Sequence, residues 1–252
     1  MRLLASSLGL LLAAASVQTL AQPAPAAPQP AGASPKVSQD TAAALARTVA
    51  PVEPMLRAEI EQARKAILAL PTLDNDAKEL ERDYPGLYAA LWTAVEPDMK
   101  RSAEASYPGY WAALEQLYLA RLTEGEAQAV MTYFKSPGGQ KLIRTMYGGF
   151  DSAPMVAEMT KSNDYTVNEQ QLKEATDAAK AKAVQQITDD DKADLWILMA
   201  SIDLQKFKAI GAETQKVTLD WVNRPDPEGE ARMQKLMEQA MQRYMAEHPP
   251  KE

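Results

Sequence analysis

The chain has 252 residues, of which 27 are Lys or Arg and 34 are Asp or Glu, so its formal net charge at pH 7 is −7. An acidic chain with evenly mixed charges lacks the clustered basic face that binding to nucleic acid or to anionic lipid requires. The sequence contains no cysteine and a single histidine, which excludes disulfides, a cysteine nucleophile and a histidine- or cysteine-based zinc site.

The first 21 residues have the three-part pattern of a cleavable signal peptide. Arg2 provides a positive start, residues 3–15 are an apolar run, and Thr19 and Ala21 offer small side chains for cleavage before Gln22. The run is shorter than the roughly 20 residues that a membrane-spanning helix needs. We therefore expect an exported protein with no membrane span, periplasmic in a Gram-negative bacterium.

Residues 22–36 are rich in Pro, Ala and Gln, and this composition predicts a disordered or polyproline-like spacer. A helical domain is predicted to follow over residues 37–163. It begins with helices over 38–49, 52–70 and 75–82, which are separated at prolines, and Asp74 is expected to cap the third.

An internal repeat comes next. The sequence Tyr-Pro-Gly-Leu-Tyr-Ala-Ala-Leu-Trp at 84–92 recurs as Tyr-Pro-Gly-Tyr-Trp-Ala-Ala-Leu-Glu at 107–115. Pro85 and Pro108 each stand where a first-turn proline suits the start of a helix. We therefore expect two similar helices packed in one bundle. Their aromatic side chains form a core face or, alternatively, a stacking platform for a sugar or peptide.

A helical hairpin is predicted over residues 122–147. Thr123 and Glu126 form a capping box at its start, and the Ser-Pro-Gly-Gly sequence at 136–139 separates its two helices. The Leu-Thr-x-x-Glu start, the following Tyr-Phe pair and the Ser-Pro-x-Gly-x-Lys turn resemble the bacterial domain-of-unknown-function 2059 family, over about residues 85–150. The resemblance implies an exported helical protein and carries no assigned chemistry.

Residues 164–252 are predicted to form a C-terminal helical region that packs on the first part. The polar loop at 161–164 marks the boundary, and helices are expected over 168–187, 189–210, 212–223 and 227–247. The composition of residues 224–229 indicates a turn. The predicted fold class is all-α, an antiparallel helical bundle with short Pro/Gly turns.

The turn inside the hairpin is one candidate interaction site. Backbone N–H groups at a helix start, with basic side chains one turn further on, are suited to an anion. The spacing does not match a P-loop. The alternative is a helix–helix connection whose glycines permit close packing. The candidate residues are Ser136, Gly138, Gly139, Lys141 and Arg144.

A methionine stripe on the last predicted helix is the second candidate interaction site, formed by Met233, Met237, Met241 and Met245. Thioethers bind copper(I), but each four-residue step drifts by about 40° on a helix, so four sulfurs cannot all meet one ion. The stripe is better interpreted as a plastic core face or an adaptable docking surface. We assign no metal and no cofactor.

The catalytic alternatives are few. Residues 189–191 are three aspartates that follow Thr188, and they predict a helix cap because the glycine and distal glutamate of a calcium loop are missing. A Ser–His–Asp catalytic triad would have to use His248, which is the only histidine and lies in a Pro-rich tail. No catalytic constellation is visible, although a carboxylate pair acting as an envelope hydrolase is a third hypothesis.

We expect a non-catalytic protein that binds another envelope polypeptide, as a chaperone, an adaptor or an assembly factor. The absence of catalytic groups, the methionine stripe and the acidic composition favour this hypothesis. The alternative is a carrier of a small apolar ligand or lipid in a bundle cavity lined by the aromatics of the repeat. A homo-oligomer is compatible with these features.

Overall fold

The structure is a computed structural model that describes residues 35–162 and 166–249, and it is an all-α helical bundle, as predicted. Within these ranges the only extended pairing is a β-bridge between Lys36 and Thr123, and no helix is both long and apolar enough to cross a membrane. The predicted signal peptide, most of the spacer and the boundary at 163–164 lie outside the described residues. The helices are α1 (Gln39–Val49), α2 (Val52–Leu73), α3 (Asn75–Asp83), α4 (Leu87–Arg121), α5 (Glu124–Lys135), α6 (Pro137–Gly149), α7 (Ala153–Ser162), α8 (Glu169–Gln186), α9 (Asp189–Ser201), α10 (Leu204–Val222) and α11 (Pro227–Glu247).

Side-chain caps set the start of most of these helices. A capping oxygen accepts a hydrogen bond from a backbone N–H of the first turn, which has no partner inside the helix. The predicted caps at Asp74, Thr123 and Thr188 are confirmed, and the latter two are complete capping boxes with Glu126 and Asp191. Five further helices begin in the same way, at Ser38, Ser136, Asn168, Asp203 and Asp226.

The prediction of two helices at the repeat is wrong, because both copies lie along one helix. Gly86, whose φ of 93° suits glycine, directly precedes α4, and the helix then continues through Pro97 and Pro108 to Arg121. A proline inside a helix removes one backbone hydrogen bond. Here apolar side chains are buried on both sides of each proline, and their burial outweighs that loss.

The two copies of the repeat present different sides of α4. Their offset of 23 residues corresponds to a net rotation of about 140° on a helix. Leu87 and Trp92 of the first copy belong to an apolar cluster with α2, α3 and α11. Tyr107 and Tyr110 of the second copy belong to a larger cluster that includes α1, α5, α6, α8 and α10. One rod therefore contributes to two cores.

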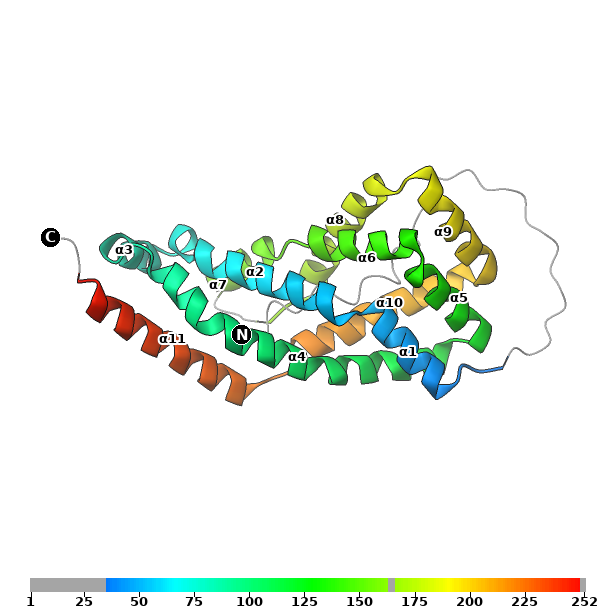
Figure 1. The fold of residues 1–252 in the computed structure, drawn as a ribbon, viewed down its shortest axis with the longest axis horizontal. Helices are drawn as coiled ribbons and strands as arrows, with labels where there is room; N and C mark the ends of the chain where they lie inside the picture. Colours follow the sequence, from blue (N-terminus) through cyan, green and yellow to red (C-terminus); the bar gives the residue numbers. More distant parts are fainter. Residues whose placement is uncertain (1–34, 163–165, 250–252) are drawn as a thin grey trace.

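Helices α10 and α11 follow α4 one after the other, and their contacts with it run in the opposite chain order (Figure 1). From the N-terminal side of α4, the contacts are Pro85 with Tyr244, Asp98 with Arg232, and Tyr110 with Trp221. The C-terminal helices thus cover both of its faces, α10 on the half with the second copy of the repeat and α11 on the half with the first.

The C-terminal region differs from the prediction at one helix boundary. The predicted helix over 189–210 is divided at residues 202–203, and no boundary falls near Gly211. The carboxylate of Asp203 accepts hydrogen bonds from the backbone N–H groups of Gln205 and Lys206, which starts α10 there. Gly211 is then buried inside α10. Helices α8, α9 and α10 pack on α6, α5 and α4, so this region lies against the earlier helices.

The segment before α1 is fastened to the start of α5 by Glu124. Its carboxylate accepts hydrogen bonds from the Thr41 hydroxyl at 2.6 Å and from the backbone N–H of Ser38 at 2.8 Å. The hydrogen bond from Thr41, followed by those from Ser38 and Gln128, lowers the pKa of Glu124 to about 2.

We expect Glu124→Gln to flatten the acid end of the stability profile. The folded carboxyl group takes up a proton less readily than the unfolded one, so its contribution to stability is present above its ordinary pKa of 4.5 and is lost as the pH falls towards 2. Melting temperatures measured by circular dichroism across this range should fall more steeply for the unmodified chain. Equal slopes in the two proteins would contradict the prediction.

Candidate functional site

The predicted turn site is a close junction between α5 and α6. The Ser136 hydroxyl accepts a hydrogen bond from the backbone N–H of Gly139 at 3.3 Å, which caps α6. Gly139 lies directly against the backbone of α5. A Cβ atom at this position would be 2.0 Å from the carbonyl oxygen of Tyr133 and 2.6 Å from the Cα of Phe134. Glycine is therefore required for the two helices to approach this closely.

The start of α6 also meets the start of α9. The Nζ atom of Lys141 lies 2.7 Å from Oδ2 of Asp191, and the hydrogen bond from Lys141, with those from Thr188, lowers the pKa of Asp191 to about 2. A Cβ at Gly138 would lie 3.4 Å from the Cα of Asp191. The ammonium of Lys141 therefore already holds a carboxylate, whereas Arg144, further along α6, is exposed.

The methionine stripe of α11 lies on the N-terminal half of α4. Met233 is buried, and Met237 and Met241 are half-buried against the same apolar cluster. Met245, near the end of the helix, is half-buried. In this structure the stripe is a helix-packing surface.

An ion pair fixes α11 beside the methionine stripe. The guanidinium of Arg232 donates a hydrogen bond to Asp98, which is 4% exposed, at 2.9 Å. Arg101 also donates to this carboxylate, at 2.8 Å. Because removing one partner would leave a buried charge only partly paired, this ion pair helps to define the register of α11 on α4.

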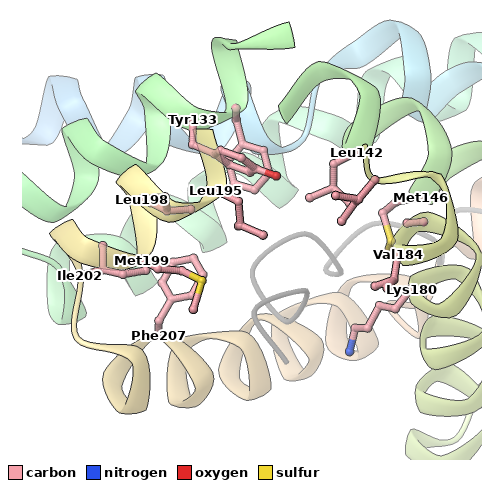
Figure 2. A pocket seen from close by; sticks show the side chains of 13 residues that line it. Tyr133, Leu142, Met146, Lys180, Val184, Leu195, Leu198, Met199, Ile202 and Phe207 are labelled. Carbon is pink, nitrogen blue, oxygen red and sulfur yellow. The ribbon is translucent and has the colours of Figure 1, made fainter. Parts of the chain in front are cut away.

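Five helices surround an apolar hollow that the sequence does not predict (Figure 2). We call it the α8–α9 hollow. About 30 Å³ of it is open to the centres of water molecules, which is room for roughly two waters. Its lining includes Tyr133 of α5, Leu142 of α6, Val184 of α8, Leu195 and Met199 of α9, and Phe207 of α10.

The part of α9 at residues 195–200 is apolar on every side but only partly covered. In the run at residues 195–199 only Leu198 is buried; Leu195 and Met199, which line the hollow with it, are half-buried, and Ile197, which does not line it, is 66% exposed. Val184, on the α8 wall, is 49% exposed. A helix that is apolar all round is normally buried. Here it leaves apolar surface that the described part of the chain does not cover.

A second depression, which we call the α6–α8 groove, borders another face of α8. It is polar and wide, with about 570 Å³ open to water centres. Its lining includes Lys141, Arg144 and Thr145 of α6 and Lys182, Gln185 and Gln186 of α8. Of the residues predicted for the turn site, only Lys141 and Arg144 line this groove.

The described residues offer little for catalysis or for metal binding. Within them, no group of three or more His, Asp or Glu side chains is placed to hold a metal ion. The carboxyl groups with a displaced pKa all have it lowered, whereas a general acid needs a raised one. These groups are Glu124, Glu126, Asp177, Asp189 and Asp191.

The remaining sequence candidates also take part in packing. His248 stacks on Tyr244 with ring centroids 4.2 Å apart. Tyr107 and Tyr110 of the repeat pack against Trp221 of α10. None of these aromatic side chains lines the α8–α9 hollow.

No family model, curated protein or solved structure matches the chain. The resemblance of residues 85–150 to the domain-of-unknown-function 2059 family stays a prediction, so the function has to be argued from the geometry. One sequence signal does point to the α8–α9 hollow. Residues 195–200 are apolar without interruption, in a helix that begins with three aspartates, and such a run needs cover on more than one side.

We expect Gly139→Ala to destabilise the fold by about 3 kcal/mol, because its methyl group would collide with the backbone of α5. Gly148 on the same helix is the matched control, since a Cβ there meets nothing within 4 Å. Gly148→Ala should leave stability unchanged or raise it by about 0.5 kcal/mol. Urea denaturation of both variants checks the pair, and similar losses would contradict the close-approach account.

We expect Met233→Ser to cost about 2 kcal/mol of unfolding free energy, because it removes a buried apolar side chain and introduces a hydroxyl. Met245→Ser, near the end of α11, should cost less than about 1 kcal/mol. Thermal denaturation measures both. If neither variant loses stability, the stripe does not serve as a packing face and the docking interpretation regains support.

Proposed function

We propose that the protein binds another polypeptide without catalysing a reaction on it, and that the α8–α9 hollow receives apolar side chains of that partner. The observation that carries the proposal is that the half-buried Leu195 and Met199 of α9 face the exposed Val184 across a hollow with a predominantly apolar lining, which also includes Lys180 (Figure 2). Exposed apolar surface of this kind typically marks a site of protein interaction. The methionine stripe, by contrast, is engaged with α4.

The size of the hollow favours a side chain over a small-molecule ligand. Ligand pockets in proteins usually enclose about 300–1,000 Å³, whereas the hollow offers about 30 Å³. A lipid or other apolar cargo would need helices to separate. The tip of a leucine or methionine side chain needs only a local rearrangement of Met199 and Val184, which are partly exposed.

The walls of the hollow are held in place before any partner arrives. The start of α9 is fixed to α6 by the Lys141–Asp191 ion pair. The start of α10 is fixed to α5 by Lys206, whose ammonium donates to Glu126 at 2.5 Å. A preformed binding site such as this hollow loses less conformational entropy on binding than a flexible one. Rigid walls with adaptable side chains between them suit a protein that accepts more than one partner sequence.

The compartment predicted from the sequence is part of the proposal. An exported chaperone, adaptor or assembly factor would meet envelope polypeptides in extended or partly folded form. Transient capture of their apolar side chains requires neither a cofactor nor an acid–base pair. The lowered pKa values of the displaced carboxyl groups agree with a non-catalytic role.

Binding of a model peptide tests the proposal. A fluorescein-labelled peptide of about four helical turns, with leucines every third or fourth residue, should bind more tightly than the same peptide with serines in their place. Val184→Ser combined with Met199→Ser should weaken the binding by about tenfold, because apolar contact is lost. Fluorescence anisotropy measures the affinities.

The matched control for this test is Leu68→Ser on α2, whose side chain is similarly exposed but lies outside the hollow. It should leave the affinity unchanged. If the serine peptide binds as tightly as the leucine peptide, or if the control variant weakens binding as much as the hollow variant, the proposal is wrong.

A further inference from the structure

The lining of the α6–α8 groove contains three cations and no carboxylate. The chain as a whole carries a net charge of −7, and the lysines on its surface are often matched by acids. On α8 and α9, for example, Lys173, Lys180 and Lys192 each pair with an aspartate of the same helix. The groove does not follow this pattern.

Two cations that line the groove have no carboxylate partner among the described residues. Arg144 takes part in none of the ion pairs found there, and it is exposed. The ammonium of Lys182 donates to the carbonyl oxygen of Gly149 at 3.1 Å, which satisfies a backbone acceptor but does not neutralise the charge. Lys141 is neutralised by Asp191. The groove therefore holds unpaired positive charge in an acidic protein.

The groove and the α8–α9 hollow lie on different faces of the α6–α8 helix pair and border a common crevice. A narrow crevice between them is lined by Leu142 and Ala183, which also line the hollow, and by Thr145 and Gln186, which also line the groove. Both depressions use α6 and α8. A single bound segment that passes over this helix pair would place an apolar side chain on one side of it and a charged side chain on the other.

We infer that the polypeptide bound at this site is an acidic segment, with aliphatic side chains in the α8–α9 hollow and carboxylates against Arg144 and Lys182 in the α6–α8 groove. The inference rests on the proposed function and adds the class of partner. The argument is charge complementarity: the unpaired guanidinium and ammonium select carboxylates, and the adjoining hollow selects a chain that carries aliphatic side chains nearby. Arg144, a candidate for anion contact from the sequence, acquires a defined role in this way.

A panel of four labelled peptides, used with the full chain, tests this inference. The peptides share one length and combine leucine or serine at the apolar positions with glutamate or glutamine at the positions between them. Anisotropy should give the tightest binding for the leucine–glutamate peptide, and this binding should weaken as salt is raised. Arg144→Gln combined with Lys182→Gln should weaken it by about fivefold and reduce its salt dependence.

Lys208→Gln combined with Lys216→Gln is the matched control. It removes two exposed lysines of α10 that line neither depression, with the same change in net charge. This variant should bind the leucine–glutamate peptide within about twofold of the unmodified chain. An equal loss in the two double variants would mean that net charge, and not the groove, attracts the peptide, which overturns the inference.

The panel also separates the inference from the proposed function. If the leucine–glutamine peptide binds as tightly as the leucine–glutamate peptide, the acidic partner is wrong while polypeptide binding stands. If the affinity depends on glutamate but not on leucine, or if no peptide binds, both the inference and the proposed function are wrong. Sedimentation of the full chain tests whether a second copy of the chain occupies the site. If the chain self-associates and the Arg144/Lys182 double variant does not, the partner is a second copy and the inference is overturned.

Discussion

The arrangement of the described helices depends on the two apolar faces of α4. A single rod whose faces point about 140° apart cannot be covered from one side, so the chain has to supply helices around it. Helices α2, α3 and α11 cover the first face, and α1, α10 and their neighbours cover the second. The α8–α9 hollow is formed where the larger of these two clusters reaches its edge, with α9 as the outermost wall.

The same polar device appears at both ends of this edge. In each of two capping boxes, the acid at the third helical position also accepts a hydrogen bond from a lysine of another helix. Glu126 pairs with Lys206 in this way, and Asp191 pairs with Lys141. One carboxylate thereby satisfies backbone N–H groups and joins two elements far apart in sequence. The charges fix the ends of the helices, and the apolar side chains between them stay free to adapt. The ends of these helices are therefore rigid, whereas the apolar side chains between the ends can change conformation.

Local signals were sufficient to predict most of the helices and several of their caps. The capping boxes at Thr123 and Thr188 depend on residues three apart, so the sequence displays them directly. The continuity of α4 could not be predicted in this way, because proline and glycine at 108–109 oppose a helix locally and only distant helices compensate. The hollow could not be predicted either, because its lining comes from five helices that are separate in the sequence.

The order in which α4 acquires its cover has a consequence for synthesis. Asp98 and its partner Arg232 are 134 residues apart, and Pro85 and Tyr244 are 159 residues apart. When a ribosome or an export channel releases the chain from its N-terminus, α4 emerges long before α10 and α11 can reach it. Helices α1, α2 and α3 are released before α4 and can pack on it at once, but the larger core stays incomplete until α10 is free and the smaller one until α11 is free.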